Sequence, residues 1–266
     1  MNTEKRAKNS KWWHSGHLHK NADGSRQVDF GSGWAEYFDA YASSYESNAF
    51  SEPGLEAMSK REVEAMVAGV KSAIGVKVLE VGSGEGRLTR ALLKEGYSIQ
   101  TTDGAPGMIR VLTERYPQTS PVRMLLDGEA IPFENETFDA VAGLRVWKYV
   151  NTRNSVLREM RRVMKTNGVL VLEWTSKSGV AKFGYSGASI NLLDRATVET
   201  ELRAAGFDVV GHTTTTRLPQ PLWKLSSRKG YVSFLNAFES VVEKTLRRAA
   251  NGTLLSRSVV TVAKAA

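Results

Sequence analysis

The sequence predicts an α/β fold built on a doubly wound parallel sheet. From about residue 74 onward, short β-rich runs alternate with amphipathic stretches, a pattern typical of parallel strands covered by helices on both faces. The first β-rich run leads directly into a glycine-rich turn, Gly82 to Gly86, and then into a helix. Acidic residues stand at the ends of the following strands, where a sheet of this kind forms its ligand crevice.

Seven segments have the composition of strands, and amphipathic helices separate most of them. Strands are expected at residues 76–81, 97–102, 122–126, 138–144, 169–174, 207–214 and 258–263. Helices are expected at 87–95, from Pro106 onward, at 154–165 and at 195–205, with Asp194 as the N-cap of the last one. Gly96, Gly168 and Gly206 follow three of these helices, as expected for C-terminal glycines.

Charge and composition divide the chain into five parts. Residues 1–27 carry six Lys/Arg against two acids and are expected to form a basic flexible tail, and residues 28–73 to form helices. Within that second part, aromatic residues at positions 34, 37, 38, 41 and 45 have helical spacing. Residues 74–216 form the expected core, 217–257 a basic helical insertion with eight Lys/Arg against two acids, and 258–266 the last core strand.

The whole-chain composition excludes several kinds of chemistry. With 36 Lys/Arg against 28 Asp/Glu the net charge is +8, and without cysteine there is no disulfide, thiolate metal ligand or cysteine nucleophile. His14, His17 and His19 form an H-x-x-H-x-H pattern without an interleaved carboxylate, so no metal site is expected. No apolar run reaches the ~18 residues of a membrane span and the N-terminus lacks a secretory stretch, which predicts a cytoplasmic protein.

The glycine-rich turn is the most specific signal in the chain. Glycines are needed where the backbone turns sharply and a ligand approaches it closely. In dinucleotide-binding enzymes the spacing is G-x-G-x-x-G, whereas here Arg87 occupies the sixth position and the third glycine comes one residue early. The acidic Glu80 at the end of the strand would repel a phosphate and suit an ammonium group. The expected ligand therefore has no pyrophosphate.

Two further acidic positions indicate a nucleoside. Asp103 follows the second strand, 17 residues after Gly86, where a carboxylate can accept two hydrogen bonds from a ribose diol. Asp127 follows the third strand and is expected to accept from the exocyclic amine of an adenine.

These residues resemble the class I S-adenosylmethionine-dependent methyltransferases, specifically their small-molecule branch. The first motif of that family is similar to Glu80 through Gly86, and its ribose-binding acid to Asp103 followed by Met108. Its adenine-side motif resembles Asp127-Gly128-Glu129. Further similar stretches are residues 157–172, 204–207 and 258–264, together with the helical segment 37–45.

The resemblance implies a Rossmann-like sheet of seven strands with the last one antiparallel, and S-adenosylmethionine as cofactor. It implies that residues 28–73 form a lid over the cofactor and that 74–216 bind it. Glu80 would hold the methionine ammonium, and Leu144 and Arg145 would offer backbone groups near the sulfonium. The implied cofactor-binding residues are Tyr45, Glu80, Gly82, Ser83, Gly84, Asp103, Gly104, Met108, Asp127, Gly128, Glu129, Leu144 and Arg145.

Methyl transfer is an in-line displacement from a good leaving group, so a dedicated base is optional. If the acceptor is a hydroxyl, the candidate bases are Tyr149, Lys148 and His212. Aromatic residues at strand ends and in the late insertion predict a flat apolar pocket for a ring-bearing or lipophilic substrate. They are Trp147, Tyr149, Trp174, Phe183, Tyr185 and Trp223.

The expected activity is methyl transfer to an oxygen or nitrogen atom of a small metabolite. The basic segments leave open a methyltransferase that acts on RNA or protein. A nicotinamide-dependent oxidoreductase on a similar sheet and a binding module without catalysis also stay open. The oligomeric state is not predicted.

Overall fold

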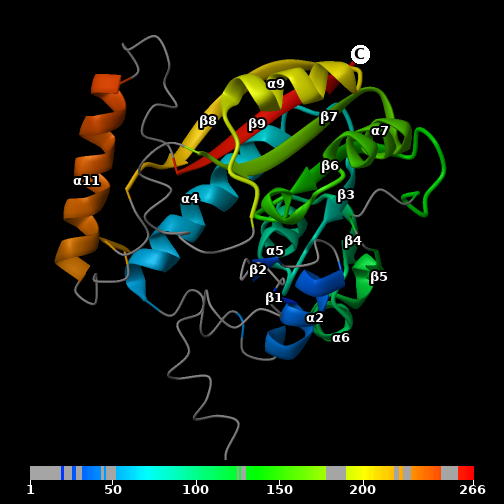
Figure 1. Cartoon of the computed structure of the whole chain (residues 1–266), viewed down its shortest axis with the longest axis horizontal. Coiled ribbons are helices and arrows are strands. Elements are labelled where there is room, and N and C mark those ends of the chain that lie inside the picture. Colours follow the sequence, from blue (N-terminus) through cyan, green and yellow to red (C-terminus); the bar gives the residue numbers. More distant parts are fainter. Residues whose placement is uncertain are drawn as a thin grey trace, which may run out of the picture.

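The structure is a computed structural model, and it describes residues 19–20, 26–27, 32–42, 45, 52–124, 126, 130–177, 190–218, 222–223, 229–246 and 257–266. A central sheet crosses the molecule, with helices on both of its faces (Figure 1). In the described ranges, no helix is long and apolar enough to cross a membrane.

The sheet has seven strands and confirms the predicted fold class. In spatial order they are β5 (Val122–Arg123), β4 (Ser98–Asp103), β3 (Lys77–Val81), β6 (Phe138–Gly143), β7 (Met164–Thr175), β9 (Ser258–Ala265) and β8 (Phe207–Thr216). The pairs from β5 to β7 are parallel, whereas β9 runs antiparallel to both of its neighbours. The order reverses between β3 and β6, and this switch point opens a crevice at the carboxyl ends of the strands.

Each face of the sheet is covered by its own helices. One face packs against α4 (Pro53–Val70) and α5 (Arg87–Lys94), and the other against α7 (Arg153–Val163) and α9 (Arg195–Ala204). The remaining helices are α2 (Ser32–Tyr41), α6 (Pro106–Arg115) and α11 (Lys229–Leu246), with the short 3₁₀ turns η2 (Pro117–Thr119) and η3 (Trp147–Tyr149). Two-residue strands β1 (His19–Lys20) and β2 (Arg26–Gln27) pair antiparallel.

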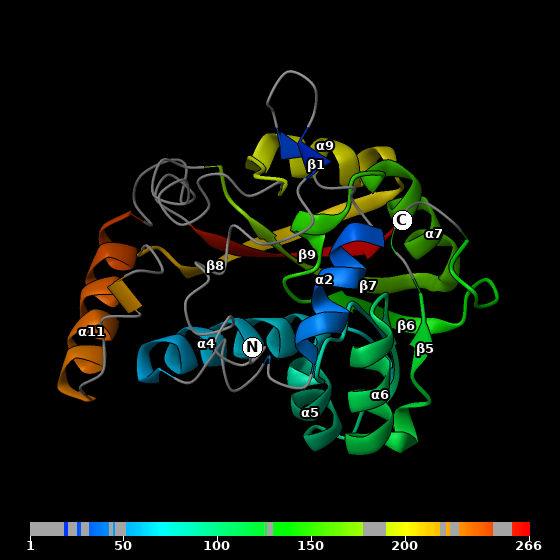
Figure 2. The same ribbon diagram turned by 60° about the horizontal axis from the view of Figure 1, so that its bottom comes forward.

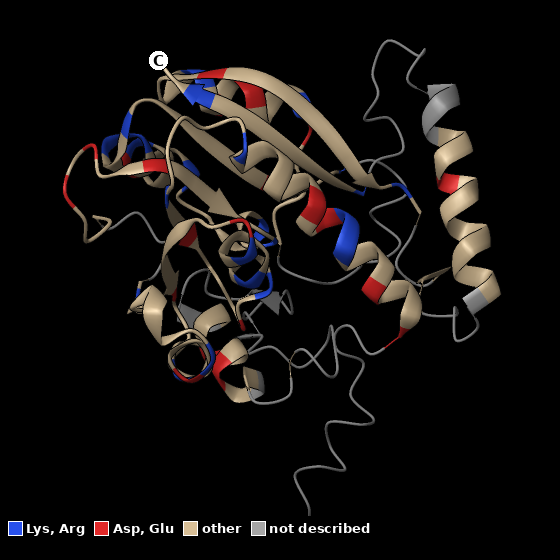
Figure 3. Cartoon of the chain, turned by 180° about the vertical axis from the view of Figure 1, so that it is seen from behind, with Lys and Arg blue, Asp and Glu red and all other residues tan. Residues whose placement is uncertain are grey.

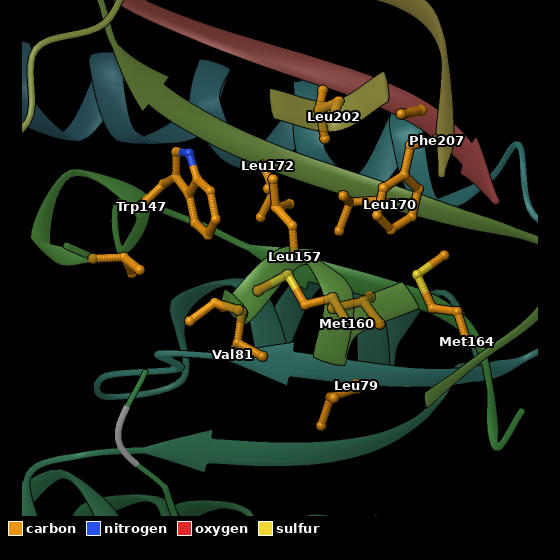
Figure 4. Packing of buried hydrophobic residues seen from close by; sticks show 14 of the residues in the cluster. Leu79, Val81, Trp147, Leu157, Met160, Met164, Leu170, Leu172, Leu202 and Phe207 are labelled. Carbon is orange, nitrogen blue, oxygen red and sulfur yellow. The ribbon is translucent and has the colours of Figure 1, made fainter. Parts of the chain in front are cut away.

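Alternation along the strands explains this layering. In β3, Val78 points to the α4–α5 face, while Leu79 and Val81 point to the α7–α9 face. Leu157 and Met160 of α7 bring the matching helical stripe onto the second face (Figure 4). The sheet is thereby buried on both sides, which holds the strand ends of the crevice in place.

Most of the predicted caps and boundaries are confirmed, with three differences. The Asp194 carboxylate accepts from the Thr197 N–H at 2.7 Å, and Gly96 and Gly206 have φ values of +85° and +83° after their helices. One difference is Gly168, which lies within β7 and not at the end of a helix, because α7 ends at Val163. Strand β7 begins at Met164 rather than at residue 169. Met164 pairs with Phe138, and the chain then bulges before the regular ladder resumes. The edge strand β5 is shorter than expected, with two residues.

The expected N-terminal lid divides into two helices with different surroundings. Helix α2 lies against α6, at the crevice (Figure 2). Helix α4 instead packs on the sheet, where Met66 and Val70 join the buried cluster beneath α5. For the basic tail, most of residues 1–27 lie outside the described ranges, so its flexibility stays a prediction.

Substituting Gly69 tests the close approach of α4 to the sheet. A Cβ at this position would lie 2.8 Å from Val171 Cγ1 and 3.0 Å from Val262 Cγ2. Gly69→Val is therefore expected to lower the free energy of unfolding by about 1–3 kcal/mol, because a packed interface cannot absorb the added volume. Gly230→Val, at an α11 position with open space around its Cβ, is the matched control in urea denaturation. Equal losses in the two variants would contradict the tight packing.

Candidate functional site

A pocket opens at the carboxyl ends of β3, β4 and β6, over the glycine turn. Nine of the cofactor-binding residues expected from the sequence line it, together with Tyr45 from the segment after α2. They are Glu80, Gly82, Ser83, Gly84, Asp103, Gly104, Met108, Leu144 and Arg145. The fold thus brings together ten positions that are spread over about a hundred residues of sequence.

The glycine turn has a backbone that other residues adopt poorly. Gly82 and Gly84 have φ values of +65° and +57°. A Cβ on Gly82 would lie 2.4 Å from Val146 Cγ2, so this glycine is required by packing. A Cβ on Gly84 would meet no atom within 4 Å. Gly84 therefore leaves its open side to whatever occupies the pocket.

Asp103 holds the turn in this shape. One carboxylate oxygen accepts from the Gly84 N–H at 2.8 Å and the other from the Ala105 N–H at 2.9 Å. Burial raises the pKa of Asp103, although these backbone hydrogen bonds offset part of the effect. Because each carboxylate oxygen can accept more than one hydrogen bond, the group keeps acceptor capacity for a ligand.

Glu80 is the second acid of the pocket, and it is 2% exposed. Its carboxylate accepts a hydrogen bond from the Thr89 hydroxyl at 2.6 Å. Burial raises the pKa of Glu80 to about 8, and the nearby Asp103 adds to the rise. The side chain is therefore protonated at neutral pH in the ligand-free protein, and a cation placed beside it would favour its ionised form.

A buried ion-pair network forms one wall of the pocket, and sequence reasoning did not find it. The Arg145 guanidinium donates two hydrogen bonds of 2.8 Å to the fully buried Glu62 of α4, and Arg87 approaches the same carboxylate at 3.6 Å. Burial alone would raise the pKa of Glu62, but the two arginines lower it below its usual value. The Arg145 backbone, at φ +59°, donates its N–H to Glu173 at 3.1 Å.

The only sequence signal for this network is one acid on an apolar helical stripe. Glu62 falls four residues after Met58 and four before Met66, both of them completely buried. An acid in such a position needs a partner on the element that covers it. The sequence does not show that Arg145, 83 residues later, supplies that partner.

Aromatic side chains form another wall of the pocket, and they are only in part the aromatics that the sequence predicted there. Trp34 and Phe38 of α2 pack against Tyr149, with ring centroids 4.5 Å and 5.4 Å apart, and Phe38 contacts Tyr45 at 5.7 Å. All four side chains line the pocket. The helical spacing of the aromatics at positions 34–45 predicts that they share one face of a helix, but it does not show that this face borders a pocket.

Three of the six aromatics expected at the crevice lie elsewhere. Trp147 (Figure 4) and Trp174 are buried in the core on the α7–α9 face, and Trp223 is buried beside Leu55. Trp174 donates its indole N–H to the Thr261 hydroxyl at 2.8 Å. Their large apolar surfaces stabilise the fold and do not border the pocket. The other two predicted aromatics, Phe183 and Tyr185, lie outside the described residues.

The three candidate bases differ in their surroundings. Tyr149 lines the pocket, whereas Lys148 is buried behind it with its ammonium 5.1 Å from the Tyr149 ring centre. His212 lies on β8, where its ring nitrogens contact the Thr261 hydroxyl at 2.8 Å and Glu199 at 3.0 Å. Burial lowers the pKa of His212 despite this carboxylate. The structure does not bring His212 to the pocket.

Three expected cofactor-binding residues cannot be placed. Asp127, Gly128 and Glu129 lie outside the described residues, although the neighbouring Met124 and Leu126 line the pocket. Across the described parts of the chain, no cluster of three or more His, Asp or Glu side chains is arranged to bind a metal ion. His14 and His17 also fall outside these parts.

The sequence of this chain is similar to known methyltransferases. The profile of the family described as methyltransferase domain matches residues 79–172, which run from β3 through most of β7. An uncharacterized methyltransferase of Mycobacterium tuberculosis is 34% identical over 101 residues, which cover 38% of this chain and 40% of that protein. The profile match identifies residues 79–172 as similar to a methyltransferase domain. The chain spans less than half the length of the first curated methyltransferases that it matches.

Two further proteins are similar to this chain, one in sequence and one in fold. The ubiquinone/menaquinone biosynthesis C-methyltransferase UbiE of Burkholderia vietnamiensis is 34% identical over 125 residues, covering 45% of this chain and 51% of that protein. A phosphoethanolamine N-methyltransferase of Haemonchus contortus, solved with S-adenosylhomocysteine, has the same fold with a TM-score of 0.57. It is 18% identical, and the match covers 86% of this chain and 58% of that one.

The raised pKa of Glu80 predicts a pH dependence of stability. The folded protein keeps a proton on Glu80 up to about pH 8, whereas the unfolded chain releases it near 4.5. The free energy of unfolding therefore falls as pH rises through this window, by on the order of 1 kcal/mol per pH unit. Glu80→Gln is expected to flatten that fall, measured by urea denaturation at several pH values. Parallel pH curves for the variant and the native protein would contradict the protonated state.

Proposed function

We propose that this chain is an S-adenosylmethionine-dependent methyltransferase that acts on a small aromatic or lipophilic metabolite. The observation that carries the proposal is Gly84, which has open space where a Cβ would lie and lines the pocket together with Glu80 and Asp103. A bare backbone flanked by two acids suits a nucleoside that carries an ammonium group and no phosphate.

The pocket residues fit this cofactor part by part. Asp103 would accept from the ribose hydroxyls with the acceptor capacity that Gly84 and Ala105 leave unused. Glu80 would ionise beside the methionine ammonium, and the buried Met108 would pack on the adenine. Asp127 and Gly128 would contact the adenine edge, as the resemblance implies. The bound cofactor would supply a methyl group attached to a sulfonium, and the thioether formed when the methyl group is transferred is a good leaving group.

The chain itself has to align the acceptor and exclude water. Trp34, Phe38 and Tyr149 form a flat apolar wall of the same pocket, and such a wall suits a ring or an alkyl chain. Leu144 and Arg145 close the cavity beside β6, and Glu62 fixes Arg145 there. Tyr149 is the candidate base that can reach a substrate in this pocket.

The acceptor atom that we propose is an oxygen or a nitrogen. The similarity to UbiE, a protein named as a C-methyltransferase, favours an aromatic carbon as the second candidate. A nucleic-acid substrate has less support, because two of the eight basic residues in the segment 217–257 are buried. These are Arg217 and Arg257, at 6% and 2% exposure.

Calorimetry with S-adenosylhomocysteine and NADH tests the cofactor, and Asp103→Ala tests the assigned site. The native protein is expected to bind S-adenosylhomocysteine and not NADH. Asp103→Ala should weaken the binding by about 2 kcal/mol, roughly a 30-fold rise in Kd, because it removes charge-assisted hydrogen bonds. Asp139→Ala removes a carboxylate that contacts Lys77 and Lys165, away from the pocket, and is the matched control. Tight NADH binding without S-adenosylhomocysteine binding would overturn the proposal.

The open side of Gly84 gives a second test. Gly84→Ala places a methyl group in the pocket, and it should lower the affinity for S-adenosylhomocysteine at least about tenfold by blocking close approach. Gly96→Ala has the same left-handed backbone and equally open space, but it lies outside the pocket lining. Both variants should lose similar stability, about 1 kcal/mol, in thermal unfolding. Unchanged binding by Gly84→Ala would show that the turn contacts no ligand.

A further inference from the structure

Helix α11 carries an exposed apolar face that the proposed reaction does not use. Phe234, Phe238 and Val241 are 60%, 46% and 62% exposed, and their spacing of four and three residues places them on one side of the helix. The rings of Phe234 and Phe238 stack with centroids 6.3 Å apart, as do those of Tyr231 and Phe234. We call Phe234, Phe238 and Val241 the outer stripe. The helix lies at one end of the molecule, away from the central sheet (Figure 1).

The other side of α11 is anchored, which holds the outer stripe away from the core. Leu235 is buried in a cluster with Leu55 and Trp223. The buried Glu239 accepts from the backbone N–H groups of Arg217 at 3.0 Å and Leu218 at 2.9 Å. It also pairs with Arg61 of α4. Because Glu239 would lose these partners if the helix rotated, the two phenylalanines cannot turn inward.

In the sequence, basic residues flank the outer stripe. Between residues 230 and 242 the sequence contains one charged residue, the buried and paired Glu239 (Figure 3). Basic residues flank this stretch in the sequence: Lys224, Arg228 and Lys229 come before it, and Lys244, Arg247 and Arg248 come after it, together with the acid Glu243. The segment 217–257 thus combines an aromatic face with basic flanks, and its net charge is +6, or +4 without the buried Arg217 and Arg257.

We propose that the outer stripe of α11 docks on the surface of a membrane that contains anionic lipids. Phenylalanine side chains of this kind insert at the boundary between headgroups and acyl chains, while flanking Lys and Arg side chains attract anionic headgroups. The helix lies on the surface and does not span the bilayer. This proposal does not depend on methyl transfer, because it rests on a face outside the pocket.

Charge and area favour a lipid surface over other partners. The exposed surface area of the outer stripe is roughly 300 Å², if a whole aromatic side chain has about 200 Å². A stable protein interface buries about 800 Å² on each partner, which is more than the stripe offers. Two copies would also bring together two segments that each carry +4 without the buried Arg217 and Arg257. Nucleic acid needs cations on the contact face itself, and the described outer face of residues 230–242 has none.

Vesicle co-sedimentation of the full chain tests the proposal. The native protein is expected to sediment with vesicles of phosphatidylcholine and phosphatidylserine, and much less with phosphatidylcholine alone or at high salt. Phe234→Ser/Phe238→Ser should reduce the bound fraction at least about tenfold, because it removes the inserted rings. Ile74→Ser/Val76→Ser also removes two exposed apolar side chains, at 93% and 59%, but between α4 and β3, and should bind like the native protein.

Circular dichroism and S-adenosylhomocysteine binding check that each variant is folded, and Phe234→Ser alone serves if the double variant is not. Failure of the native protein to sediment at low salt would overturn the proposal, as would equal losses in the two double variants. A concentration-dependent dimer that only Phe234→Ser/Phe238→Ser abolishes would assign the stripe to a second copy. Binding to RNA without binding to vesicles would assign the basic flanks to nucleic acid. Either result would overturn the proposal that a lipid surface is the partner of this helix.

Discussion

The carboxylate of Asp103 determines the shape of the site, because it ties the turn after β3 to the start of α6. Its two oxygens accept from Gly84 and Ala105, on either side of the crevice. The turn can follow this path because Gly82 and Gly84 adopt left-handed backbone angles, which let the chain curve away from the strand ends. One buried acid therefore positions the bare backbone and remains an acceptor inside the pocket.

A second constraint joins the sheet to the helix that covers it. The fully buried Glu62 of α4 is held by Arg145 from the end of β6 and by Arg87 at the start of α5. Removing one member of such a network would leave an uncompensated buried charge, which is strongly unfavourable. The arrangement makes the position of Arg145 depend on α4, so a helix that packs on the sheet also shapes the pocket. The aromatic wall comes from α2 instead, through Trp34 and Phe38.

The sequence predicted the part of the site that local chemistry dictates. The turn from Gly82 to Gly86 and the acids Glu80 and Asp103 follow from their places at strand ends, whereas Met108 of α6 follows only from the family resemblance. It did not predict which aromatics border the pocket, because an aromatic side chain has the same pattern in a core as in a crevice. Trp147 and Trp174 are core residues, whereas Trp34 lines the pocket.

The sequence by itself determined the seven strands, most of the helix boundaries and the glycine turn, because these depend on periodicity, on caps such as Asp194 and on backbone freedom within a few residues. Only the tertiary structure decided that Glu62 meets Arg145, that His212 is held at β8 and that the phenylalanines of α11 face outward. These features depend on contacts between residues far apart in the chain. No local pattern encodes such contacts, since they arise only when separate helices and strands pack together.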